Sequence, residues 1–187
     1  MLSYTKIAAK GKLLISEPAL LDYYFERSVV LLADHNEEGS YGVILNKPIN
    51  VKLNEIINDF PSSNIKVFLG GPVKTDNLFM IHTLGEQIDD SIEIVKGLYW
   101  GGNIEQIKDL IISKKIKPGS IHFYLGYSSW EPEQLNRELA ENAWLVINAS
   151  VKTVFDPQPK KMWSNFLKNL GDKYAIWANQ PIDPILN

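Results

Sequence analysis

The sequence predicts an α+β fold with a mixed β-sheet. Its 187 residues are enough for one sizeable hydrophobic core and few for two. Strand-like segments follow one another as hairpins in the first half of the chain and alternate with helical patterns in the second half. That mixture favours α+β over a doubly wound parallel sheet. We therefore expect one domain over residues 1–187, with an irregular C-terminal tail from about residue 156.

The first half of the chain is expected to contain strands and one short helix. Residues Val29 to Ala33 are all apolar, so both faces of a central strand should be buried there. A polar loop, His35–Ser40, suits a hairpin. Apolar residues at Leu53 and three, four and seven positions later predict a short amphipathic helix. The strands expected in this half span residues 11–15, 29–33, 41–45, 65–69, 78–83 and 91–95.

Three helices are expected in the second half. Asn103 can accept hydrogen bonds from the first free N–H groups of one helix, and Gln106 stands where a capping box requires it. Another helix should begin near Pro132 and end near Asn142. The last is expected over residues 160–170, after which Pro181 and Pro184 favour irregular structure. Strands are expected at residues 120–125 and 144–149.

Composition narrows the possible functions. The chain has no cysteine, which excludes disulfides, thiolate nucleophiles and Cys-ligated metal sites. Its net charge of −3 disfavours non-specific DNA binding. The three histidines stand singly in separate elements, so we expect no metal and no cofactor. Lys6, Lys10 and Lys12 interrupt the N-terminus, and the apolar run from Val29 to Ala33 is too short to cross a bilayer. We expect a cytoplasmic protein without a membrane partner.

An aromatic segment gives the best candidate for a surface site. Tyr127 to Trp130 is expected to be a tight turn after a strand, with Gln134 and Glu138 on one face of the following helix. An aromatic platform beside two polar side chains could hold a small ligand or peptide. In the alternative interpretation, Trp130 fills the gap between strand and helix, Gln134 satisfies a buried backbone group, and Glu138 pairs with Arg27 or a lysine.

Two glycine pairs give a second candidate site, for an anion. Gly101 and Gly102 precede the helix capped by Asn103, where N–H groups and the helix dipole could attract an anion. Gly70 and Gly71 are the weaker pair. No phosphate-binding motif follows either of them, and tight turns with a helix cap remain the alternative.

Other chemistry has less support. A Ser-His-Asp set could be assembled from Ser28 or Ser128 with His82 and Asp34, but no nucleophile-elbow motif is present. The basic positions could contact DNA, although no DNA-binding motif accompanies them, and a solvated lysine surface is the alternative. These positions are Lys114, Lys115, Lys117, Lys160, Lys161 and Lys168.

Several motifs, in this order, resemble the bacterial YqgE/AlgH family, some of whose members carry the label of transcriptional regulator. They are Arg27-Ser28, Gly42, Asn46, Pro48, Gly70-Gly71-Pro72, His82, Gly126-Tyr127, Trp130, Gln134-Leu135, Glu138 and Trp144. The resemblance covers about residues 12–155. It implies a bifurcated sheet curled into a pseudo-barrel with helices packed outside, in a cytosolic protein whose biochemical activity is unsettled. Ser129 stands where the family commonly has glycine, so a turn of positive φ would be strained there.

Two functional hypotheses follow. The absence of a catalytic motif favours a non-enzymatic regulatory or adaptor protein that binds an unknown protein or small-molecule partner through its surface. The alternative is a protein that binds or hydrolyses a nucleotide or phosphate metabolite. The alternative requires a cleft that joins one of the glycine pairs to Tyr127, Trp130 and His82.

Overall fold

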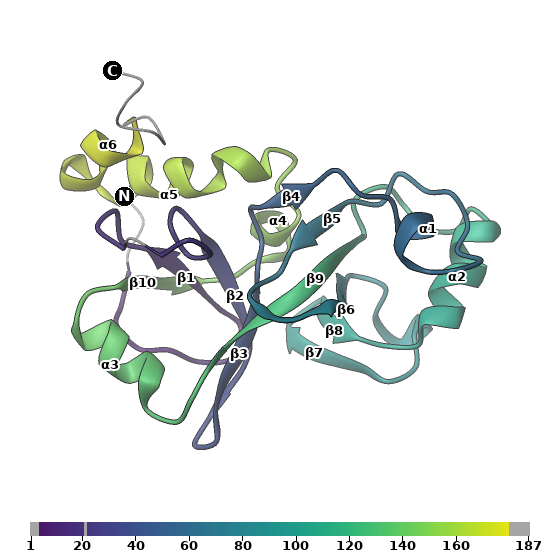
Figure 1. Cartoon of the computed structure of the whole chain (residues 1–187), viewed down its shortest axis with the longest axis horizontal. Coiled ribbons are helices and arrows are strands. Elements are labelled where there is room, and N and C mark those ends of the chain that lie inside the picture. Colours follow the sequence, from purple (N-terminus) through teal and green to yellow (C-terminus); the bar gives the residue numbers. More distant parts are fainter. Residues whose placement is uncertain (1–3, 21, 180–187) are drawn as a thin grey trace.

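The computed structural model describes residues 4–20 and 22–179, and the expectation for Pro181 and Pro184 lies outside them. A mixed sheet curls into a half-barrel with helices packed outside, which confirms the predicted fold class (Figure 1). Its strands are β1 (Lys12–Ser16), β2 (Val29–Asn36), β3 (Gly39–Ile44), β4 (Pro48–Ile49), β5 (Val67–Leu69), β6 (Val73–His82), β7 (Ser91–Val95), β8 (Leu98–Gly101), β9 (Ile121–Trp130) and β10 (Trp144–Asn148). The helices are α1 (Leu53–Ile56), η1 (Gly85–Gln87), α2 (Ile104–Ile112), α3 (Gln134–Ala140), α4 (Val151–Val154), η2 (Pro159–Lys161), α5 (Met162–Leu170) and α6 (Asp172–Ala178).

Strand β9 is the point at which the sheet forks. One of its edges pairs antiparallel with β6. The other edge is divided, because β5 runs parallel to residues 123–125 and β3 runs antiparallel to residues 128–130. The main path of the sheet therefore runs β10-β1-β2-β3-β9-β6-β8-β7, with β5 and β4 branching off it. The bifurcation that the family resemblance implied is present.

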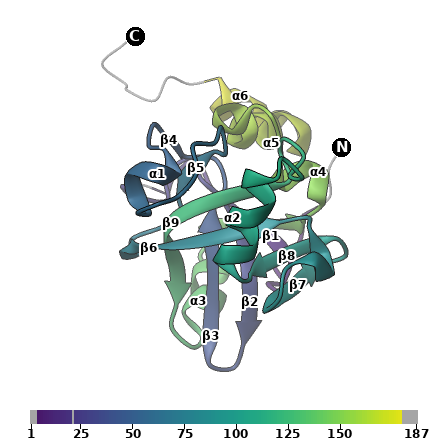
Figure 2. The same cartoon turned by 90° about the vertical axis from the view of Figure 1, so that its right-hand side faces the viewer.

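The half of the sheet formed by β10, β1, β2 and β3 is buried on both faces. Along β1 and β2, alternate side chains such as Leu13 and Leu31 pack toward Trp163 and Leu167 of α5. The intervening side chains, such as Leu14, pack with residues of α3 on the opposite face. Figure 2 shows α5 and α6 above the sheet and the β2–β3 hairpin extending away from them. The doubly buried central strand predicted over residues 29–33 is thus confirmed.

Helices α1 and α2 cover the other half of the sheet. Leu53 of α1 and Ile107 of α2 pack with Met80 of β6 and with Ile121 and Phe123 of β9. The helix expected over residues 53–60 is only one turn long, since Ile57 is already extended. Isoleucine, asparagine and aspartate have modest helix propensities, so this segment lacks the local preference for a longer helix.

Several elements were not predicted, and the tight turn expected at residues 127–130 was wrong. Strands β4 and β8 and helices η1, α4 and α6 had no expected counterpart. Residues 127–130 form the end of β9 and not a tight turn, because β3 supplies backbone partners for Ser128, Ser129 and Trp130. Ser129 pairs with Tyr41 in this ladder and is not among the residues with positive φ.

Candidate functional site

Tyr127 and Trp130 lie on opposite faces of β9. Side chains alternate along a strand, so residues three positions apart point in opposite directions. Tyr127 contacts Phe79, at 5.3 Å between ring centroids, and is partly exposed. Trp130 is buried beneath α3, with Leu135 and Trp144 in its cluster. The structure therefore does not bring the two rings together as one platform.

Glu138 of α3 connects Trp130 to Trp144. Its Oε2 accepts hydrogen bonds from both indole Nε1 atoms, at 2.9 Å from Trp130 and 2.7 Å from Trp144. Its Oε1 accepts from Gln134 Nε2 at 2.8 Å, and Gln134 Oε1 accepts from the Glu131 backbone N–H at 3.0 Å. We call Trp130, Gln134, Glu138 and Trp144 the indole–carboxylate cluster. Its polar groups bond to one another and to the backbone, as in the packing alternative. The Glu138 carboxylate accepts from two indoles and one amide.

His82 and the Gly101–Asn103 segment lie together where β6, β8 and α2 meet. The buried His82 ring has its Nε2 3.0 Å from the Gly101 carbonyl oxygen and 3.1 Å from Ser91 Oγ. Its Nδ1 accepts from the Leu84 N–H at 3.2 Å, so the Nε2 atom carries the proton that Gly101 accepts. Burial lowers the pKa of His82, and the bond to Gly101 opposes that shift. His82 is therefore neutral at pH 7.

The same segment begins α2. Asn103 Oδ1 accepts from the N–H groups of Glu105 and Gln106, at 3.0 and 3.4 Å, which confirms the predicted cap. The capping box does not form, because the Gln106 side chain bonds to Asp89 instead. Gly102 has φ of 112°, and a Cβ there would collide with neighbouring side chains. These contacts give the segment a complete structural role.

The other predicted arrangements are not assembled. A Cβ on Gly70 would collide with the backbone of Gly126, so this glycine permits the close approach of the chain to β9. Ser128 Oγ donates to the Gly70 carbonyl at 3.1 Å. The hydrogen bonds of His82 go to Gly101, Ser91 and Leu84, so neither serine of the proposed Ser-His-Asp set bonds to it.

Two adjoining cavities form a groove, which we call the basic groove, in a different part of the molecule. The β4 lobe, of about 570 Å³, lies between β4, the segment before β5, and η2. The α2 lobe, of about 660 Å³, lies between that segment, the α2–β9 connection and residues 155–157. The two lobes share Pro157 and the residues from Ser63 to Lys66. Chain segments that are distant in sequence thus form one surface.

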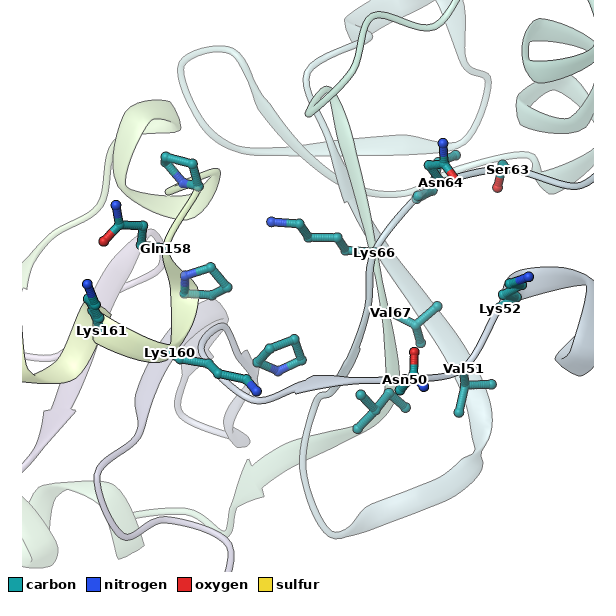
Figure 3. A pocket seen from close by; sticks show the side chains of 15 residues that line it. Asn50, Val51, Lys52, Ser63, Asn64, Lys66, Val67, Gln158, Lys160 and Lys161 are labelled. Carbon is teal, nitrogen blue, oxygen red and sulfur yellow. The ribbon is translucent and has the colours of Figure 1, made fainter. Parts of the chain in front are cut away.

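The charge of the basic groove is strongly positive. Its lining includes six exposed lysines, Lys52, Lys66, Lys114, Lys117, Lys160 and Lys161. Among the described residues none of these lysines has a salt bridge, and Asp156 is the only carboxylate in the lining. Figure 3 shows Lys66 pointing across the β4 lobe toward the side formed by Gln158 and Lys161. In a chain of net charge −3, this concentration of cations predicts attraction of an anion.

His122 of β9 lines the α2 lobe and has an unpaired ring nitrogen. The ring is 5% exposed and lies between Phe68 and Phe155, at centroid distances of 4.8 and 4.7 Å. Burial lowers the pKa of His122 to about 4, and the positive charge of Lys66 adds to that shift. Its buried Nδ1 has no hydrogen-bond partner among the described residues, and the same is true of Ser63 Oγ in the shared wall. The groove therefore combines exposed lysines with two polar atoms that are buried without a partner among the described residues.

Sequence reasoning found part of this site. The sequence indicated Lys114, Lys117, Lys160 and Lys161 as basic positions. The first two, however, precede the other two by more than forty residues in the chain. Lys52, Lys66, Ser63 and His122 carried no signal, because none belongs to a charged run or a motif. Only the packing of η2 beside the segment before β5 brings these groups together.

The described residues offer neither a cluster of metal ligands nor a membrane-spanning helix. No group of three His, Asp or Glu side chains in this part of the chain could hold a metal ion. No helix in residues 4–20 or 22–179 is long and apolar enough to cross a membrane.

Comparison with known proteins identifies the relatives of this chain. The AlgH-like family model matches residues 13–175. A UPF0301 protein of Bacteroides thetaiotaomicron is 46% identical over 97% of this chain and 92% of its own length. A UPF0301 protein of Chlorobaculum tepidum is 41% identical, and the match covers 97% of each chain.

Two solved structures share the fold. The solution structure of AlgH from Pseudomonas aeruginosa, also a UPF0301 protein, has a TM-score of 0.73, with 28% identity over 98% of this chain and 100% of that one. A crystal structure of a Corynebacterium diphtheriae protein has a TM-score of 0.76 with 19% identity over 93% of both chains, a likeness of fold alone. The chain belongs to the YqgE/AlgH family, whose function is uncharacterised.

Proposed function

We propose that this protein is a non-enzymatic binding protein of the regulatory or adaptor kind, and that it recognises an anionic partner in the basic groove. The observation that carries the proposal is a set of six lysines that have no salt bridge with any described residue. They surround one groove whose described lining holds a single carboxylate. Like charges gathered on one surface repel one another, so this arrangement costs the free protein stability. An anionic partner would remove that cost. A cytoplasmic location is part of the proposal.

The non-enzymatic part rests on how the candidate catalytic groups are used. His82 bonds to backbone and Ser91, Glu138 bonds to two indoles, and Ser128 bonds to a carbonyl oxygen. A general base must reach a proton of the substrate with a free nitrogen or oxygen. These groups are already engaged in contacts that hold the fold together.

The first test is a thermal-shift measurement with three kinds of anion: inorganic triphosphate, an oligothymidylate and poly-glutamate. A ligand at about 100 times its dissociation constant adds about 2.7 kcal/mol to the free energy of unfolding. We expect at least one anion to raise the melting temperature of the wild type. Lys66→Glu should abolish the rise, and it should survive in Lys96→Glu, which reverses an exposed lysine in the β7–β8 turn.

Two outcomes of this measurement would contradict the proposal. If no anion shifts the wild type, or if Lys66→Glu and Lys96→Glu reduce the shift equally, the groove is not the recognition site. Equal loss would indicate general screening of net charge instead of a specific surface.

A second candidate, the binding of a nucleotide or phosphate metabolite, is favoured by the concave shape of the groove. Each lobe has a volume in the range of small-molecule sites. Phe155, which is partly exposed in the α2 lobe, offers aromatic surface for a base. A shift with triphosphate or ATP, but with neither polymer, would support this candidate over an adaptor.

A further inference from the structure

We infer that the anionic partner is a peptide: an extended acidic segment of another protein, in which acidic and apolar residues alternate, laid along residues 62–66 across both lobes. This inference rests on the proposed function and names the class of partner. Three features of the basic groove carry it: an apolar floor, an extended wall with free backbone groups, and a scarcity of groups that select phosphates or bases.

The floor of the groove is apolar beneath the lysines. The side chains that form it are Ile49, Ile65, Val67, Ile111, Ile116 and Ile121. All six are buried or partly buried, whereas the six lysines are exposed. An extended peptide presents alternate side chains to opposite sides. Apolar residues of such a peptide can therefore face the floor while its carboxylates meet the lysines.

The wall shared by the lobes has the form of an unpaired strand. From Ser62 to Lys66, exposed and partly buried residues alternate, which is the pattern of an extended backbone on a surface. Strand β5 begins only at Val67. No backbone hydrogen bond connects the N–H or C=O groups of Ser62 to Ile65 with another described residue. A row of free backbone groups is the element to which peptides add as a further strand.

The lining is poor in groups that recognise other polyanions. Among the described residues, the β4 lobe contains no aromatic side chain, and the α2 lobe contains only Phe155 and His122. Single-stranded nucleic acids need successive aromatic side chains on which the bases stack. Arginine, the residue that binds phosphate with two parallel hydrogen bonds, is absent from the described lining of both lobes. Lysines around an apolar floor match a carboxylate-bearing peptide better than they match a single-stranded nucleic acid or a phosphate compound.

The test uses two pools of fluorescent peptides about seven residues long, enough to span about 23 Å. In the acidic pool, Asp or Glu alternates with Ile, Leu or Val; in the neutral pool, Asn or Gln replaces the acids. Binding to the full-length protein is followed by fluorescence anisotropy. We expect the acidic pool to bind at least about tenfold more tightly than the neutral pool. Lys66→Glu with Lys117→Glu should remove that difference, and Lys96→Glu should retain it.

A second measurement tests the strand-like mode of binding. Two versions of the tightest acidic peptide carry N-methyl groups on alternate residues. One version is methylated at the odd-numbered residues and the other at the even-numbered residues. A methyl group removes a backbone donor, so the version whose methyl groups face residues 62–65 should bind about tenfold more weakly than the other. Equal affinity of the two versions would overturn addition to this wall.

The failure of this inference differs from failure of the proposed function. If triphosphate or oligothymidylate binds in a Lys66-dependent way and the acidic pool does not, the groove binds anions but not peptides. If no anion and neither pool binds, both proposals fail. Equal binding of the acidic and neutral pools overturns the charge-based recognition claimed here.

Discussion

The indole–carboxylate cluster and the basic groove are opposite solutions to the placement of charge. In the cluster, the Glu138 carboxylate accepts two indole N–H bonds and one amide N–H bond. In the groove, six lysines have no salt bridge with any described residue, and His122 Nδ1 is buried without a partner. The polar groups of the cluster satisfy one another, whereas the lysines of the groove have no ionic partner among the described residues.

This difference indicates where binding should be sought in the molecule. A buried polar group costs free energy unless it is hydrogen-bonded, so a saturated network such as that of Glu138 serves folding. Charges that remain unpaired on one surface do not stabilise the folded chain in this way. The first region should therefore respond to mutation in stability, and the second in affinity.

The largest effect should follow from Glu138→Ala. The substitution leaves the Nε1–H groups of Trp130 and Trp144, both in nearly fully buried side chains, without an acceptor. Two unsatisfied donors should lower the free energy of unfolding by about 4 kcal/mol, measured by urea denaturation. Glu141→Ala, at an exposed position just after the same helix, should change it by less than about 0.5 kcal/mol. A similar small change for both variants would show that the cluster is not structural.

Acid should destabilise the protein through His122, a groove residue whose side chain is almost fully buried. Its pKa in the folded state is about 4, below the ordinary 6.5, so the unfolded chain binds more protons between those values. The stability is complete above pH 6.5 and is lost as the pH falls toward 4. From pH 7 to pH 4.5 we expect a loss of about 2 to 3 kcal/mol from this group.

The control for this prediction is His122→Phe, which removes the titrating group and keeps an aromatic ring between Phe68 and Phe155. The same pair of urea denaturations at pH 7 and pH 4.5 should give a smaller difference in the variant. Some acid sensitivity should persist, because burial also lowers the pKa of His82. An unchanged pH dependence would show that His122 does not titrate in this range.

A smaller effect is expected at the cap of α2. Asn103→Ala removes the oxygen that accepts from Glu105 and Gln106, and should lower the free energy of unfolding by about 1 kcal/mol. Asn103→Asp keeps an oxygen acceptor and should recover most of the loss. If Asn103→Asp is as unstable as Asn103→Ala, the amide has a role other than capping. Because this segment is saturated like the cluster, anion binding should be the same in both variants.

The sequence predicted most of the fold because its strands are patterned for burial. The uniformly apolar run from Val29 to Ala33 predicted a doubly covered strand, and Asn103 predicted the start of a helix. The turn expected at Tyr127 was wrong for a reason outside the local sequence. Serine and tyrosine are compatible with either a strand or a turn, and pairing with β3 decided the outcome.

The candidate sites show the same limit from the functional side. Trp130 and His82 stand out in the sequence because tryptophan and histidine are uncommon in it. Glu138 stands out because it shares a helix face with Gln134. Their polar groups are consumed by packing, which only coordinates reveal. Lys66 and Ser63 look ordinary in sequence, and they gain significance only because Pro157 and its neighbours lie opposite them.

The smallest effect joins the two regions through Lys66. Its charge is one of the two causes that hold down the pKa of His122. Lys66→Gln should therefore move that pKa upward, measured by NMR titration of the ring, while the free energy of unfolding at pH 7 changes by less than about 0.5 kcal/mol. Lys96→Gln, which changes a lysine that does not line the groove, should leave the titration of His122 unchanged. If an anion that fills the groove produces the same upward shift in the wild type, the groove is occupied next to His122, because an anion near a titrating histidine favours its charged form. An anion that binds without moving this titration would have to lie outside the α2 lobe.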